Sequence, residues 1–235
     1  MCEDLPARPS NLDQGLKLSL FGTLAFSLMS CAAPHDQQGQ EPRKALERTE
    51  AAIVGGQAEA GFPSVGALTF FVPGQGYAGS FCSGTLIAED WVLTAAHCLS
   101  REEAGFRPEP RIVRFYSGPD ARPLPGNRAP SNGSFFRVDR FELHPNYNGD
   151  NDNGDDIALM HLSEPALGLT PYPINQAQLR GLENELVTYI GFGVSDGLRS
   201  TGGGVKRRGD IPIVQIDRNV YVSRFDGEGV CFGDS

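Results

Sequence analysis

Three side chains of the sequence could act together in nucleophilic catalysis: the imidazole of His97, the carboxylate of Asp156 and the hydroxyl of Ser235. An imidazole can take a proton from a hydroxyl near neutral pH, and a carboxylate can orient the imidazole and stabilise its charge. Taken singly, each residue has a plainer interpretation, as a structural histidine, an acid at a turn or strand edge, and a loop serine. Only their combination and order indicate catalysis.

The segments around these residues resemble the chymotrypsin/trypsin family of serine endopeptidases. The resemblance extends over residues 53–235. Its motifs, in the family's order, are Ile53-Val54-Gly55-Gly56, Ser83-Gly84-Thr85-Leu86-Ile87 through Trp91-Val92-Leu93-Thr94-Ala95-Ala96-His97-Cys98, Asp156-Ile157-Ala158-Leu159, Gly191-Phe192-Gly193 and Gly233-Asp234-Ser235. Phe192 stands where the family has Trp. The resemblance implies an all-β fold, a chymotrypsin-like double six-stranded antiparallel β-barrel whose second barrel is incomplete in this chain.

The family mechanism assigns a role to each reactive group. By resemblance, His97 takes the proton of the nucleophile Ser235, and Asp156 fixes the histidine tautomer. The backbone N–H groups of Gly233 and Ser235 form the oxyanion hole. Asp155 is the alternative acid. In the family the acid directly precedes the Ile, which favours Asp156.

Activation by proteolysis also follows from the resemblance. A cut before Ile53 frees an α-ammonium that pairs with Asp234 and orders the oxyanion hole. Ala52 precedes this cut, and the nearest basic residue, Arg48, is five positions upstream of Ile53, so a trypsin-like activator is disfavoured.

Substrate specificity in the family depends on the residue six positions before the nucleophile, which is Gly229 here. Without a carboxylate at this position, nothing offsets the desolvation of a substrate Arg or Lys. Val230 and Phe232 complete an elastase-like specificity segment, and we expect small or medium aliphatic P1 residues. An enzyme with this preference could cut after Ala52 and activate itself.

Composition excludes several other classes of protein. The formal net charge is −9, from 20 Lys+Arg against 29 Asp+Glu, which disfavours nucleic-acid binding. Hydrophobic residues make up 40% of the chain, enough for a packed core.

The acidic stretch 150–155 lacks the pattern of an EF-hand, and no zinc-ligand spacing occurs, so no metal or cofactor is expected. We interpret Lys206-Arg207-Arg208 as a solvated loop or a nicking site, and His144 and His161 as structural.

Many short strands are predicted after residue 53. Short runs of β-branched or aromatic residues begin there, and clusters of Gly, Pro, Asn and Asp separate them. The runs are Val65–Val72, Ser80–Ala88, Trp91–Ala96, Arg111–Tyr116, Phe135–Leu143, Ile157–Leu162, Leu186–Phe192, Ile211–Ile216 and Val220–Val222. These runs favour an all-β barrel or sandwich. A helix is also possible over Gln176–Glu185.

The N-terminal part has the features of an export signal. Leu18–Ser30 is an apolar run that follows Lys17 and ends in small residues before Cys31, as in a bacterial lipobox whose Cys is lipidated. An ordinary signal peptide is the alternative, and the long acidic leader indicates a start codon placed too far upstream. We expect residues 1–31 to be the leader, 32–52 a polar tether or pro-segment, and 53–235 the protease domain. The protein would be secreted or held at the bacterial cell envelope, as a periplasmic or outer-membrane lipoprotein.

Export places the five cysteines in an oxidising compartment. Cys82 and Cys98 flank a strand–turn–strand pattern and could form a disulfide that contributes roughly 3 kcal/mol to stability. Cys231 then lacks a partner, which suggests one beyond residue 235.

The sequence stops at the proposed nucleophile, whereas family members continue with glycines, further strands and a C-terminal helix. We therefore expect a C-terminally truncated fragment that is inactive alone, from a parent that is a serine-type endopeptidase. Expected partners are protein or peptide substrates, with membrane anchoring through lipidated Cys31, no nucleic acid, and a monomeric state. The alternatives are a non-catalytic protease homologue that serves as a binding module and a surface lipoprotein whose barrels only display loops. Because the motif residues of all these roles are present, the enzyme is favoured.

Overall fold

The computed structural model describes residues 56–100, 107–150, 154–195, 202–217 and 220–223. The described residues are nearly all β, as the sequence predicts. Their elements are β1 Gln57–Ala58, β2 Val65–Val72, β3 Gly76–Ala88, β4 Trp91–Thr94, α1 Ala96–Ser100, β5 Val113–Ser117, β6 Ser134–Leu143, β7 Ala158–Leu162, β8 Leu186–Gly191, β9 Arg207–Asp217 and β10 Val220–Ser223. No helix in this described part has the length and apolar character needed to cross a membrane.

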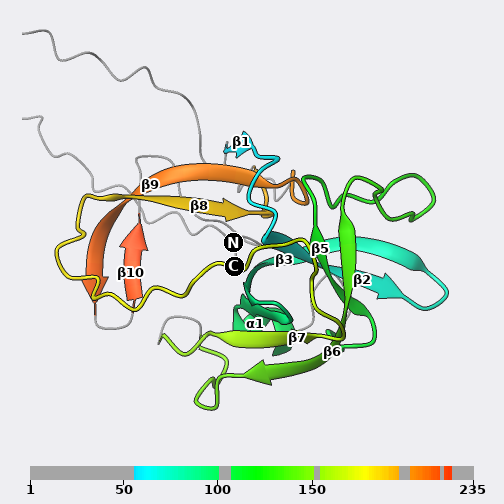
Figure 1. Cartoon of the computed structure of the whole chain (residues 1–235), viewed down its shortest axis with the longest axis horizontal. Coiled ribbons are helices and arrows are strands. Elements are labelled where there is room, and N and C mark those ends of the chain that lie inside the picture. The colour runs from blue at the N-terminus through cyan, green and yellow to red at the C-terminus, as the bar shows by residue number, and fades with distance from the viewer. Residues whose placement is uncertain (1–55, 101–106, 151–153, 196–201, 218–219, 224–235) are drawn as a thin grey trace, which may run out of the picture. The chain divides into compact units, whose positions relative to one another are not determined.

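Six strands form a closed antiparallel barrel in the order β2-β3-β4-β7-β6-β5, which confirms the barrel expected from the sequence (Figure 1). Alternate residues of each strand point inward, as the strand period requires. The interior is filled by large apolar side chains, among them Leu68, Phe70, Phe81, Leu86, Val92, Val113, Phe115, Met160 and Leu162. Gly84 permits close approach of β3 to β4, because a Cβ there would lie 2.7 Å from the Val92 side chain. The barrel is therefore a packed core.

The remaining strands form an open antiparallel sheet with β9 at its centre. β9 pairs with β1, β8 and β10, and β8 pairs with the first part of β9, from Arg207 to Pro212 (Figure 1). This sheet occupies the part of the chain in which the resemblance implies a second, incomplete barrel. Ile211 and Ile213 of β9 are buried, whereas Leu186 of β8 is 67% exposed.

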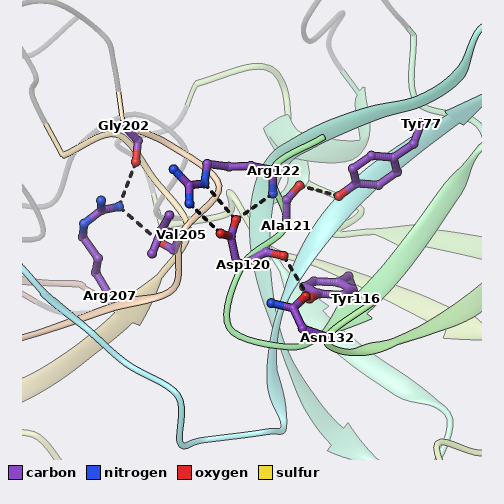
Figure 2. Close-up of polar contacts among 9 residues, drawn as sticks. All are labelled: Tyr77, Tyr116, Asp120, Ala121, Arg122, Asn132, Gly202, Val205 and Arg207. Atoms are coloured by element: carbon purple, nitrogen blue, oxygen red, sulfur yellow. Dashed lines mark hydrogen bonds and ion pairs between the residues drawn. The ribbon is translucent and has the colours of Figure 1, made fainter. Parts of the chain in front are cut away.

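The loop between β5 and β6 joins the barrel to the segment that enters β9. Figure 2 shows the Tyr77 hydroxyl donating to the Ala121 carbonyl, at 2.5 Å, and the Tyr116 hydroxyl donating to the Asp120 carbonyl, at 3.0 Å. On the other side of the loop, the Ala121 N–H donates to the Gly204 carbonyl at 2.7 Å. Two tyrosines of the barrel thus hold the loop against which the β9 segment packs.

Two local predictions from the sequence are wrong. The segment Gln176–Glu185 contains turns and irregular backbone and no helix. Lys206-Arg207-Arg208 is not a solvated loop, because Lys206 is 1% exposed and Arg207 and Arg208 begin β9. The pairing of β9 with β1 and β8 draws this basic triplet into the sheet.

Candidate active site

His97 lies on the short helix α1, immediately after β4 ends at Thr94. The buried Thr94 hydroxyl donates to the Ser83 carbonyl at 2.8 Å, which fixes the point where the chain leaves the barrel wall. Ala96, Cys98 and Leu99 turn into the core, so the helix is anchored by its apolar side. His97 remains partly accessible, with 17% of its side chain exposed.

Asp156 lies two positions before the start of β7 and 59 positions after His97. β4 and β7 are antiparallel neighbours in the barrel, with Thr94 opposite Ala158. The residues that follow β4 and those that precede β7 therefore emerge at the same end of this strand pair. Barrel pairing thus brings His97 and Asp156 together.

The Asp156 carboxylate contacts His97 at two points. Its Oδ1 accepts the His97 backbone N–H at 2.8 Å, and its Oδ2 lies 2.7 Å from Nδ1 of the ring. An ionised carboxylate only accepts hydrogen bonds, so the ring proton belongs on Nδ1 and the lone pair on Nε2. Only 12% of the Asp156 side chain is exposed. The imidazole is therefore held in the orientation and tautomer that a general base needs.

A disulfide between Cys82 of β3 and Cys98 of α1 ties the helix to the barrel. The two Cα atoms are 6.1 Å apart, and both residues are buried. The Cys98 Sγ lies 3.5 Å from Nε2 of His97. The disulfide thus fixes the helix directly beside the ring.

Comparison with known proteins identifies the family. The model of the Trypsin family matches residues 53–235. The chain belongs to the trypsin family. Human chymotrypsin-like elastase family member 1 is 34% identical over 125 residues, which is 51% of this chain and 42% of that protein. Mannan-binding lectin serine protease 1 of Mus musculus is 31% identical over 118 residues, and coagulation factor XII of Sus scrofa is 35% identical over 94 residues.

The match to mannan-binding lectin serine protease 1 covers 48% of this chain and 17% of that protein. The match to coagulation factor XII covers 40% of this chain and 14% of that protein. The chain thus spans less than half the length of these curated relatives.

In this trypsin-family chain the two neighbouring acids have different partners. Asp156 contacts His97, whereas Asp155 Oδ1 lies 3.4 Å from Nδ1 of His144. The structure therefore brings together His97 and the acid that directly precedes Ile157.

Several site residues expected from the sequence lie outside the described residues. They are Ser235, Gly233, Asp234, Gly229, Val230, Phe232, Ile53 and Cys31.

The trypsin-family motif Gly191-Phe192-Gly193 contacts the same region of β3. The Phe192 N–H donates to the buried Ser83 hydroxyl at 2.9 Å, and Ser83 follows Cys82 of the disulfide. Sequence reasoning included Ser83 in a motif but assigned it no contact. The available signal was a hydroxyl residue directly after the apolar Phe81 and Cys82 in a predicted strand, because a buried hydroxyl needs a hydrogen-bond partner.

Lys206 is the other residue whose position sequence reasoning missed. Its Nζ donates to the carbonyls of Gly61, at 3.2 Å, and Phe62, at 3.0 Å, and lies 5.7 Å from the centre of the Phe192 ring. Burial lowers the pKa of Lys206 to about 8, and nearby Glu59 opposes this shift. Nothing in the local sequence distinguishes this lysine from the two partly exposed arginines that follow it.

Proposed function

We propose that the chain carries the catalytic residues of an exported serine endopeptidase that hydrolyses peptide bonds through an acyl-enzyme. The observation that carries this proposal is the two-point contact between Asp156 and His97, in a chain of the trypsin family. The contact orients the imidazole and sets its tautomer, which are the two requirements for a base that activates a hydroxyl.

In the proposed mechanism the Ser235 hydroxyl attacks the carbonyl carbon of the scissile bond while its proton passes to Nε2 of His97. Asp156 stabilises the imidazolium that forms. The N–H groups of Gly233 and Ser235 bind the developing oxyanion. Collapse of the tetrahedral intermediate breaks the C–N bond, and His97 returns the proton to the leaving amine. Water then hydrolyses the acyl-enzyme by the same steps.

The proposed substrates are proteins or peptides with a small or medium aliphatic residue at P1. Gly229 offers no carboxylate to a basic side chain, and Val230 and Phe232 are apolar neighbours. An elastase-family protein among the relatives supports this choice. The test compares kcat/KM on matched peptides with Ala, Val, Lys or Arg at P1, and a preference for Arg or Lys contradicts it.

The proposed activation is a cut between Ala52 and Ile53 by an enzyme of the same preference, followed by pairing of the new ammonium with Asp234. N-terminal sequencing of the mature protein tests it, and a mature chain that begins elsewhere in the pro-segment contradicts it. Residues 1–31 are proposed as an export leader and residues 32–52 as a tether. Mass spectrometry of the mature N-terminal peptide shows whether Cys31 carries lipid and the protein is anchored at the cell envelope.

The decisive experiment begins with the coding DNA downstream of the Ser235 codon and uses whatever polypeptide the gene encodes. A fluorophosphonate probe that phosphonylates activated serines should label Ser235. His97→Ala should abolish labelling, and His161→Gln, a matched histidine change away from Asp156, should preserve it. A folded product that stays unlabelled contradicts the proposed chemistry.

A further inference from the structure

Three potential metal ligands gather beside the His97–Asp156 pair. The sulfur atoms of Cys82 and Cys98 and a ring nitrogen of His97 lie within 4.8 Å of one another. In the oxidised chain the two sulfurs are bonded together, so neither is available as a thiolate. We propose that reduction of the Cys82–Cys98 disulfide converts this cluster into a binding site for Zn²⁺, with both thiolates and Nε2 of His97 as ligands.

The distance between His97 and Cys98 fits a shared metal ion. The two atoms, Nε2 and Sγ, are 3.5 Å apart. Two ligands bound to tetrahedral zinc at about 2.05 Å for nitrogen and 2.3 Å for sulfur are separated by about 3.6 Å. The imidazole and this sulfur therefore need little rearrangement to bind one ion.

Asp156 supplies the second requirement of a histidine ligand. A metal-bound histidine usually donates its other ring N–H to a carboxylate, which fixes the ring and makes it a better ligand. Nδ1 of His97 already faces Asp156 Oδ2 at 2.7 Å, which leaves Nε2 as the coordinating nitrogen. The contact that orients a general base thus also orients a metal ligand.

Only Cys82 has to move. After reduction the sulfur of Cys82 must move away from that of Cys98 until the two sulfur atoms are about 3.8 Å apart, which is the spacing of two thiolates on tetrahedral zinc. The Cα atoms are 6.1 Å apart, and rotation about the Cα–Cβ bonds can provide this change. Both cysteines are buried, and 17% of the His97 side chain is exposed, so an ion enters from the histidine side.

The redox step requires a dithiol reductant. The reductant supplies two electrons and two protons, the Cys82–Cys98 bond breaks, and the reductant becomes a cyclic disulfide. Zn²⁺ binding then releases the two thiol protons. If the proposed protease function holds, the bound ion also takes the lone pair that accepts the Ser235 proton, and the reduced, zinc-loaded protein is inactive. The metal site itself does not rest on that function.

The test uses the full chain with Cys2, Cys31 and Cys231 replaced by Ser, so that only the cluster can supply thiolates. The protein is reduced, the dithiol is removed without oxygen, and Co²⁺ is added as a spectroscopic probe. The expected result is one Co²⁺ per chain with a thiolate-to-cobalt charge-transfer band that Zn²⁺ abolishes. The oxidised protein should show no such band, and a reduced protein without the band overturns the proposal.

Three variants separate this site from adventitious binding. His97→Gln should weaken Co²⁺ binding at least as much as Asp156→Asn, for which we expect about 10–100-fold. His161→Gln, whose ring contacts carboxylates instead of sulfur, should change it less than twofold. Equal affinity in wild type and His97→Gln overturns the proposal.

If reduction unfolds the chain, Zn²⁺ should restore its far-ultraviolet circular dichroism in the wild type and not in His97→Gln. Failure to restore the wild type overturns the proposal equally.

Discussion

Two histidines of the barrel each place Nδ1 2.7 Å from a carboxylate oxygen, His97 facing Asp156 and His161 facing Asp139. Their surroundings differ. Asp156 is 12% exposed and also accepts the His97 backbone N–H, whereas Asp139 is 49% exposed. The Nε2 of His161 faces a second carboxylate, that of Asp90, at 3.3 Å. Both ring nitrogens of His161 therefore face carboxylates, whereas Asp156 contacts the ring of His97 through Nδ1.

Both pairs involve β7: Asp156 lies just before it and His97 just after its neighbour β4, whereas His161 lies on β7 and Asp139 on its other neighbour, β6. Thr94 and Ala158 lie opposite each other at the His97 end of the β4–β7 ladder, and Trp91 and His161 lie opposite each other at the other end. A short histidine–carboxylate distance therefore does not by itself identify a catalytic pair. The two pairs differ in the burial of the acid, in the second hydrogen bond to its other oxygen, and in the carboxylate that faces Nε2 of His161.

The largest expected effect comes from exchanging one acid in each pair. Asp156→Asn should lower kcat/KM of the active gene product about 10⁴-fold, because the amide favours the wrong histidine tautomer. Asp139→Asn should change kcat/KM less than twofold. Steady-state kinetics on an Ala-P1 peptide checks both values. Equal losses in the two variants would remove the functional distinction between the pairs.

This distinction was predicted from the sequence, because Asp156 and His97 lie in family motifs and His161 does not. The strand β2 was also predicted with its observed bounds, since an apolar run between turn residues reports burial directly. The position of Lys206 could not be predicted. Its burial depends on carbonyls at Gly61 and Phe62, about 145 residues away, and such pairing leaves no local pattern.

The second largest effect should come from the barrel core beside β7, the strand that both pairs involve. Met160 of β7 is fully buried, lies opposite Val92 and is placed between Asp156 and His161 along the chain. Met160→Ala should lower the free energy of unfolding by about 2–5 kcal/mol. Leu167→Ala, at a position that is 84% exposed, should change it by less than about 0.5 kcal/mol. Urea unfolding measures both changes, and equal changes in the two variants would contradict the core position of Met160.

The third prediction concerns the buried Lys206, which makes the free energy of unfolding depend on pH and so affects any comparison of the two pairs across pH. The ordinary pKa of Lys206 is 10.5, and burial lowers it to about 8 in the folded chain. Between these values the unfolded chain binds more protons, so this group makes the free energy of unfolding rise with pH. Lys206→Met should remove that rise, measured by urea unfolding between about pH 8 and 9.5.

The upper limit avoids Tyr77, whose pKa is raised by burial and whose effect on stability has the opposite sign above pH 10. An unchanged slope in Lys206→Met contradicts the assignment to Lys206.

The smallest expected effect concerns the second histidine itself. His161→Gln removes two partly exposed ion pairs and the contact of its ring with Trp91, at 4.7 Å between ring centres. The free energy of unfolding should fall by about 1 kcal/mol or less, because exposed ion pairs contribute little. A loss above about 3 kcal/mol would show that His161 supports the barrel as strongly as a core residue.

The strand order of the barrel also determines when the His97–Asp156 pair can form during folding. β2, β3 and β4 pair in sequence order, as do β5, β6 and β7, so each half is a local meander. The halves join only through β2–β5 and β4–β7, whose partners are far apart in the chain and whose pairing carries the main entropy cost of loop closure. We therefore expect a folding chain to form both halves before the pair, because the His97–Asp156 hydrogen bond requires β4 to pair with β7.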